Sequence, residues 1–359
     1  MSKQGLQFDW LILAAILGLL TFSLLLIRSI AQSLFLQQLV YAGLGLFLFF
    51  VFSQIDWRIY RRFAWLFYGG SLFFLGTTFL FGTFSRGAVR WVQVAGLTIQ
   101  PSEIIKPFLI LFFADFFSQK ENLDFKKIFL AILLLALPSG LIFLQPDLGS
   151  SLVVILFWLG MLFAAGLSWH WLVAGFGGLL VAVPLIWQFL KDYQKQRIDT
   201  FINPLADPLN AGYNVIQSVI AVGSGQLLGR GLGQGPQSHL QFLPERHSDF
   251  IFASLAEELG FSGALILLLF FSLLLWRLLA IAQKTNDRFQ WLVCLGVFAM
   301  IFGQIFVNIG MNLGLLPVTG ITLPLVSSGG SSLFAILLGL GMIENIAGFI
   351  KKNEVKYLL

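Results

Sequence analysis

Residues 249–276 read DFIFASLAEELGFSGALILLLFFSLLLW, a mostly apolar run that begins at an aspartate. It is long and apolar enough to cross a bilayer as a helix, which takes about 20 such residues. Similar runs recur along the chain, in which 58% of the 359 residues are hydrophobic and only 11% are charged. The sequence therefore predicts an all-α, polytopic integral membrane protein whose helices form a single bundle, with residues 1–359 as one membrane domain.

Ten segments have the length and apolarity of a transmembrane helix. They lie near residues 10–27, 35–54, 64–82, 103–118, 128–144, 150–166, 169–190, 249–276, 290–312 and 331–349. A long stretch, 191–248, separates the seventh predicted helix from the eighth. Because ten is an even number of crossings, both ends of the chain are predicted to lie on the same side of the membrane.

Lysine and arginine decide which side that is. Basic residues gather in alternate loops, while the intervening short loops carry only Arg28, Arg86 and Arg90. By the positive-inside rule, both termini are cytoplasmic and the long loop is extracytoplasmic. The net charge of +5 then suits membrane headgroups rather than nucleic acid, because the cations lie at the ends of apolar runs. The first apolar run is predicted to be a retained helix, since no small-residue cleavage pattern follows it.

The same topology places segments 83–102, 145–149, 191–248 and 313–330 on the outer face. Glycine and polar residues concentrate there, so we expect the working face outside. The stretch 191–248 is too long for a simple connector, and its residues 215–222 are apolar enough for an interfacial helix. Its run 229-GRGLG-233 could bind an anion through backbone N–H groups or act as a hinge. The run lacks the Lys-Ser/Thr ending of a nucleotide-binding loop.

Asp249 is the residue most indicative of chemistry. It lies in 245-ERHSDFIF-252, at the mouth of a membrane helix, where a carboxylate is costly and by default suggests a functional site. The three histidines His170, His239 and His247 show no pairing at metal-ligand spacing, and no cluster of carboxylates is evident. The residues therefore predict no dedicated metal site and no certain cofactor, and a divalent cation stays an open alternative.

A second group of polar residues lies in 100-QPSEIIK-106. Ser102 suits an N-cap and Glu103 suits the first turn of a helix. Lys106 follows Glu103 by three positions and shares its helix face. The two could form a structural ion pair or face a charged ligand, and the sequence supports both interpretations equally.

Two further outer segments are rich in turn residues. In 145-QPDLGS-150, the composition predicts a tight turn into a helix, with Asp147 as its cap. Residues 316–332 combine several glycines and prolines with serine and threonine. Irregular backbone at membrane depth is tolerated only where it is buried in protein or lines a cavity. An outer face with one acid, several cations and irregular backbone suits a lipid-linked anionic substrate.

These segments resemble those of the SEDS family of cell-wall proteins, named for shape, elongation, division and sporulation. The match runs in order through residues 86–106, 145–149, 207–214, 217–218, 242–260 and 308–332. Residues 242–253 and 308–311 resemble the elongation branch more than the division branch. The chain departs from the family at Ser248, where threonine is usual and the hydroxyl is kept, and at Ser328, where the usual tyrosine ring is lost.

The resemblance implies a peptidoglycan glycosyltransferase that polymerises lipid II on the outer face of the bacterial cytoplasmic membrane. It implies that undecaprenyl pyrophosphate leaves and that Asp249 is the catalytic general base, taking the proton from the 4-hydroxyl of the acceptor sugar. A cation beside a departing pyrophosphate would stabilise its developing charge. The residues implied to bind lipid II through its pyrophosphate or sugars are Glu103, Lys106, Arg90, Arg197, Arg246, Gln217, Ser218 and Ser248.

The resemblance also implies partners: lipid II, the undecaprenyl-linked glycan, the membrane, and a class B penicillin-binding protein that acts as transpeptidase. Two other functions stay open. A lipid II flippase would need the same helices and cation-lined cavity but no proton-accepting carboxylate. A non-catalytic scaffold for wall synthesis would tolerate the loss of Asp249, Glu103 and Lys106.

Overall fold

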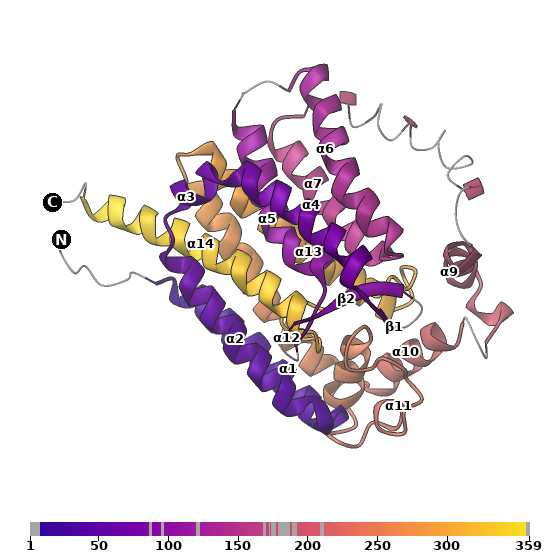
Figure 1. Ribbon diagram of the computed structural model, residues 1–359. Helices are drawn as coiled ribbons and strands as arrows, with labels where there is room; N and C mark the ends of the chain where they lie inside the picture. Colours follow the sequence, from indigo (N-terminus) through magenta and orange to yellow (C-terminus); the bar gives the residue numbers. More distant parts are fainter. Residues whose placement is uncertain are drawn as a thin grey trace.

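The computed structural model describes residues 8–85, 88–94, 97–119, 123–167, 192–208 and 212–356, with short pieces at 170–171, 173, 177–178 and 187–188. Long helices dominate these residues and run side by side in one bundle (Figure 1). They are α1 (Trp10–Ile30), α2 (Phe35–Gln54), α4 (Ala64–Phe81), α5 (Pro101–Ser118), α6 (Phe125–Leu144), α7 (Leu148–Ala164), α12 (Ile251–Lys284), α13 (Arg288–Asn312) and α14 (Gly330–Lys356).

These helices confirm the prediction of an all-α, multi-pass membrane protein. Seven of the helices in the described part of the chain are long and apolar enough to cross a membrane. Of the others, α7 is a shorter apolar helix, and α5 carries Glu103, Lys106 and Asp115 within 18 residues. The predicted helix 169–190 falls mostly outside the described residues.

Helix α5 lies at the centre of the bundle, packed against α4, α7, α13 and α14. Nearly every side chain from Pro101 to Phe117 is buried. A helix that is mostly apolar on every side belongs in an interior. The few ionisable side chains of α5 are expected to face other helices rather than lipid. The remaining helices cover it, with α14 against α2, α1 against α12 and α13 against α7.

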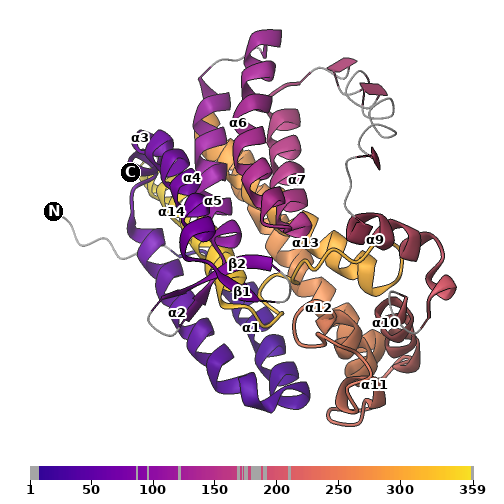
Figure 2. The same ribbon diagram turned by 45° about the vertical axis from the view of Figure 1, so that its right-hand side comes forward.

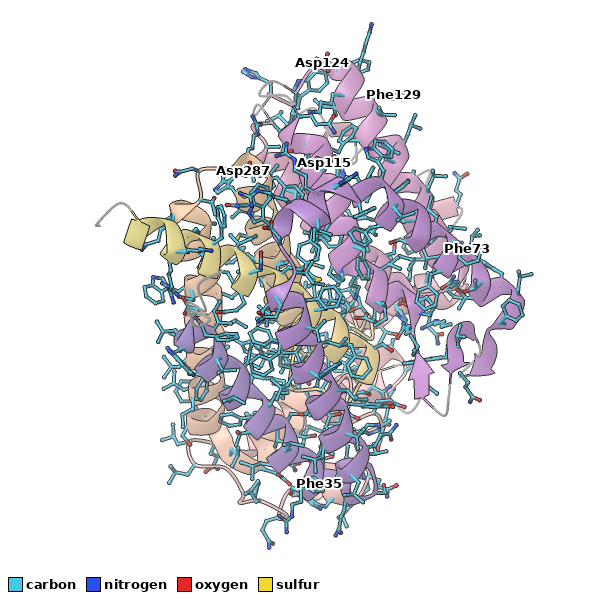
Figure 3. The ribbon with its side chains drawn as sticks, turned by 60° about the vertical axis from the view of Figure 1, so that its left-hand side comes forward. Phe35, Phe73, Asp115, Asp124, Phe129 and Asp287 are labelled. Atoms are coloured by element: carbon cyan, nitrogen blue, oxygen red, sulfur yellow. The ribbon has the colours of Figure 1, made fainter. Side chains whose placement is uncertain are left out.

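Charged and aromatic side chains mark the two ends and the outer surface of the bundle. Asp115, Asp124 and Asp287 lie toward one end, and Phe35 lies at the opposite end (Figure 3). Phe73 is 76% exposed and points away from the bundle in the same view, which suits a surface that faces lipid. The ends of α1 and α14 also meet, because Lys351 Nζ donates to the carbonyl of Phe8 over 2.9 Å.

Aspartate side chains set where several helices begin. Asp56, Asp124, Asp147 and Asp287 are the N-cap residues of α3 (Trp57–Arg62), α6, α7 and α13, and each accepts a hydrogen bond from a first-turn N–H. Such a bond satisfies one of the donors that every helix start leaves open. The prediction that Asp147 caps a helix is therefore confirmed.

A small antiparallel sheet precedes α5, and the sequence analysis did not predict it. Its strands are β1 (Thr83–Ser85), β2 (Ala88–Val94) and β3 (Leu97–Ile99), in the order β1-β2-β3, with Thr83 opposite Trp91 and Val92 opposite Ile99. The valines of β2 suit a strand. A search for long apolar runs does not detect strands this short.

The long loop between the seventh and eighth predicted helices contains short helices. They are α9 (Asp192–Ile202), α10 (Tyr213–Ser224) and α11 (Pro236–His239), with 3-10 turns at Pro204–Ala206 and, earlier in the chain, at Gln32–Leu34. Helices α9, α10 and α11 lie together on one side of the bundle (Figure 2), and α10 packs against α12 and α13. The helix expected over residues 215–222 is therefore present as α10.

Helix α12 is broken at Gly260, where φ is +66° and ψ is −164°. The glycine-rich part of the long loop packs into this break. The N–H groups of Arg230 and Gly231 donate to the carbonyls of Glu257 and Glu258, both over 2.9 Å. The N–H of Gly233 donates to the carboxylate of Glu258 over 3.2 Å. These N–H groups are thus used within the protein, and of the two alternatives for this run, binding of an anionic ligand gains no support. A Cβ at Gly229 would lie 2.2 Å from the Glu258 carbonyl oxygen, so close packing requires glycine there.

Candidate functional site

Asp249 lies at the start of α12, half-buried, two residues before the first helical residue. Its backbone carbonyl accepts hydrogen bonds from the side-chain amides of Asn308, over 2.9 Å, and Asn312, over 3.0 Å. Its carboxylate lies beside Gly320, where an added Cβ would be 3.4 Å from Oδ2. Gly320 is itself exposed, so the carboxylate borders a surface that substrate could reach.

Irregular segment 316–329 covers one side of Asp249 and is held by buried polar groups. Ser327 Oγ donates to the carbonyl of Ser248 over 2.6 Å, and the N–H of Ser328 donates to the carbonyl of His247 over 2.8 Å. Residues Leu323, Leu325 and Val326 are buried. As expected for irregular backbone at membrane depth, this part of the segment is enclosed in protein.

Glu103 and Lys106 form a buried ion pair on α5. The distance from Lys106 Nζ to Glu103 Oε1 is 2.5 Å, and the two side chains are 1% and 11% exposed. Ser150 Oγ donates to the same oxygen over 3.1 Å. The other oxygen, Oε2, is buried with no hydrogen-bond partner among the described residues. The structural ion pair therefore exists, and Oε2 is an acceptor that the described residues leave unused.

Asp147 joins this pair to the turn before α7. Its Oδ2 accepts from Gln100 Nε2 over 2.7 Å and from Ser102 Oγ over 2.9 Å, while its Oδ1 accepts from the N–H of Ser150 over 3.1 Å. The expectation that Ser102 is an N-cap is wrong. Gln100 occupies the N-cap of α5, and the hydroxyl of Ser102 is used by Asp147.

A close backbone contact brings the α5–α7 cluster next to Asp249. A Cβ at Gly149 would lie 2.8 Å from the carbonyl oxygen of Thr319. The following residue of that segment, Gly320, borders the Asp249 carboxylate. The carboxylate and the cluster of Glu103, Lys106 and Asp147 thus flank one short segment of chain.

The predicted cations occupy different places. Arg90, on β2, donates from Nε to the carbonyl of Gln145 over 3.0 Å and also bonds the carbonyl of Pro146. Arg246 donates from Nε and Nη2 to the carbonyl of Ile30, over 3.2 and 3.1 Å. Arg197 lies on α9, partly exposed. Arg90 and Arg246 therefore hold the ends of helices α6 and α1, and contacts of these three arginines with substrate stay a prediction.

The predicted polar residues also differ in accessibility. Ser218 is fully buried, and its hydroxyl donates to the carbonyl of Asn312 over 2.8 Å, which fastens α10 to α13. Gln217 is half-buried on α10. Ser248 Oγ donates to Glu245 Oε2 over 2.8 Å. Substrate binding by these three side chains stays a prediction.

The sequence analysis missed Asn308, Asn312 and Gly320 as parts of this site. The spacing of the two asparagines on a mostly apolar helix was a usable signal, because residues four apart share a helix face. Among the described residues, no three His, Cys, Asp or Glu side chains gather in a way that could hold a metal ion.

Comparisons with known proteins agree with this fold. A family model for FtsW, RodA and SpoVE, described as "Cell cycle protein", matches residues 5–352. The peptidoglycan glycosyltransferase MrdB of Escherichia coli is 42% identical over 347 residues, covering 95% of this chain and 93% of that protein. Stage V sporulation protein E of Bacillus subtilis is 37% identical over 366 residues, covering 97% and 99%.

Two solved structures resemble the whole chain. One, described as "Structural coordination of polymerization and crosslinking by a peptidoglycan synthase complex", has a TM-score of 0.85 at 36% identity and covers 96% of this chain and 99% of its own. The rod shape determining protein RodA of Thermus thermophilus has a TM-score of 0.73 at 31% identity, covering 95% and 97%. The chain therefore belongs to the FtsW, RodA and SpoVE family of cell cycle proteins, the SEDS family that its sequence motifs indicated.

Proposed function

We propose that this chain is a peptidoglycan glycosyltransferase of cell elongation that polymerises lipid II, with Asp249 as the general base. The enzyme class follows from the family and from the relatives named peptidoglycan glycosyltransferase, which are similar over nearly the full chain. The substrate, the product and the residue roles are the proposal.

One observation carries the role of Asp249: its carboxylate borders the exposed Gly320 while its backbone is fixed from behind by two buried side chains. A base must reach hydrogen-bonding distance of the proton that it takes. In the proposed reaction Asp249 takes the proton of the acceptor sugar's 4-hydroxyl. That oxygen then bonds the anomeric carbon of the donor, and undecaprenyl pyrophosphate leaves.

The charge on the leaving pyrophosphate needs cations close by. Lys106 is proposed first, because it belongs to the cluster that flanks the same short segment as Asp249. Arg90, Arg197 and Arg246 follow. Glu103 is proposed to use its free oxygen, Oε2, to accept a hydrogen bond from a sugar hydroxyl or amide.

The proposed setting is the bacterial cytoplasmic membrane, with the site on the outer face and both termini in the cytoplasm. Support comes from the alternation of basic loops and from the hydrogen bond that brings the start of α1 to the end of α14. A class B penicillin-binding protein is proposed as partner. A solved relative described as a peptidoglycan synthase complex that coordinates polymerization and crosslinking supports this partner.

The test is polymerisation of purified lipid II by the protein, alone and with its penicillin-binding partner, comparing wild type, Asp249→Asn and Asp124→Asn. Asp124 caps α6 at the other end of the bundle, and asparagine caps a helix as well as aspartate does. We expect polymer from wild type and Asp124→Asn, and none from Asp249→Asn.

Equal polymer from all three proteins would remove Asp249 as the base. No polymer from any of them, in preparations shown to be folded and partnered, would overturn the polymerase function. Flipping of lipid II in proteoliposomes would then be the next measurement.

A further inference from the structure

Two fully buried asparagines, Asn308 and Asn312, lie four residues apart near the end of α13. That spacing puts both side chains on one face of the helix. Burying a side-chain amide is costly unless its hydrogen bonds are made. The partners of these two amides therefore indicate what the asparagines do.

Asn312 caps the start of α12 from a different helix. The N-cap residue of α12 is Phe250, whose side chain cannot accept a hydrogen bond. Asn312 Oδ1 instead accepts from the N–H of Ala253 over 3.0 Å, one of the donors that a helix start leaves open. Its Nδ2 donates to the carbonyl of Asp249 over 3.0 Å and to that of Asn308 over 2.8 Å.

Asn308 joins the same carbonyl to the irregular segment. Its Nδ2 donates to the carbonyl of Asp249 over 2.9 Å and to the carbonyl of Ile321 over 2.7 Å. Ile321 directly follows Gly320, which borders the Asp249 carboxylate. Asn308 thus sets the distance between the backbone of Asp249 and the segment that its side chain faces.

The two side chains converge on one acceptor. A backbone carbonyl has two lone pairs, and both hydrogen bonds to that of Asp249 come from α13. Capping of α12 requires the Asn312 oxygen alone. The second donor, from Asn308, adds nothing to capping but restricts the backbone of Asp249 further.

We infer that Asn308 and Asn312 are positioning residues for the reaction, which hold the Asp249 carboxylate at its working distance from segment 320–321. This inference rests on the proposed role of Asp249. Both side chains are fully buried, so they act through Asp249 and not by touching substrate.

The test compares Asn308→Ala and Asn312→Ala with a matched control, Asn345→Ala. Asn345 makes the same two kinds of bond at the opposite end of the bundle. Its Oδ1 accepts from the first-turn N–H of Trp57 over 3.1 Å, and its Nδ2 donates to the carbonyl of Ser53 over 3.0 Å. Asn345 is half-buried, so the control reports the cost of losing an amide with these two kinds of hydrogen bond without disturbing Asp249.

We expect all three variants to lose thermal stability in detergent. Lipid II polymerisation should separate them, because an error of about 1 Å in the position of a reacting group can cost roughly 100-fold in rate. The kcat of Asn308→Ala and Asn312→Ala should fall roughly 10- to 100-fold, with KM changed by less than about threefold. The kcat of Asn345→Ala should stay near that of wild type. Equal kcat losses in all three variants would overturn the inference and make the asparagines structural.

Single variants of Asp249 and Asn308 separate this inference from the proposed function. Full activity of Asp249→Asn alone would refute the role of Asp249. An inactive Asp249→Asn together with a wild-type kcat for Asn308→Ala would refute only the positioning role.

A milder substitution covers the case in which the alanine variants do not accumulate. Asn308→Ser keeps a hydroxyl that can donate to one of the two carbonyls, so its kcat should fall between those of wild type and Asn308→Ala. A kcat equal to that of wild type would also overturn the inference.

Discussion

Replacing Lys106 with methionine removes the cation from the ion pair of α5 while keeping a long, unbranched side chain. Lys106 is 1% exposed, and its Nζ lies 2.5 Å from Glu103 Oε1. After the change, the hydroxyl of Ser150 is the remaining hydrogen-bond partner of that carboxylate among the described residues. A buried carboxylate would then have lost its counter-charge.

Breaking one side of a buried pair lowers stability by about 3–5 kcal/mol, because the remaining charge stays buried. Removing both charges is often close to neutral. We therefore expect Lys106→Met to lower the free energy of unfolding by about 3–5 kcal/mol, and the double variant Glu103→Gln, Lys106→Met to recover most of that loss. The control is Arg58→Met, whose partner Asp56 is exposed, with an expected loss of at most about 1 kcal/mol.

The assay is unfolding in mixed micelles, followed by helical circular dichroism, together with lipid II polymerisation at equal protein concentration. A double variant that is stable but slow would show that the pair serves substrate as well as folding. A loss below about 1 kcal/mol for Lys106→Met would refute the reasoning, because Glu103 would then not depend on its buried partner.

Two further predictions concern packing and pH. Gly225→Ala should prevent accumulation in the membrane, because its Cβ would lie 1.8 Å from a carbonyl oxygen of α12. Gly233 has open space around it and a φ of +80°, so Gly233→Ala should lower the free energy of unfolding by only about 1–2 kcal/mol. Equal accumulation of the two variants would contradict the packing. Burial raises the pKa of Asp9, but the hydrogen bond and charge of Arg277 and the charge of Lys351 outweigh it and hold the pKa below its ordinary value of 3.8. The ionised group thus stabilises the fold above pH 3.8, and this contribution disappears as pH falls through the lowered pKa. The melting temperature of Asp9→Asn should lie below that of wild type at neutral pH and approach it in acid; a constant difference would argue against this linkage.

The local pattern of the sequence was enough to predict the membrane class and the positions of the helices. Apolar length is a local property, so the predicted helix 35–54 coincides with α2 and the predicted helix 64–82 differs from α4 by one residue. The motifs around Asp249 also sufficed to indicate the family. Residues of a turn or cap act on their neighbours, which is why the role of Asp147 could be predicted.

Contacts between residues far apart in the chain could not be predicted in this way. Asn308 and Asn312 meet Asp249 some 60 positions away in sequence, at separations of 59 and 63, and nothing in the local pattern specifies which helix faces meet. The same holds for the glycine-rich loop, whose N–H groups pair with two carbonyls and a carboxylate of the broken helix α12. Apolar length sets where each helix lies in the chain. The packing of one helix against another decides which polar groups pair, because most buried polar groups find a partner within the fold.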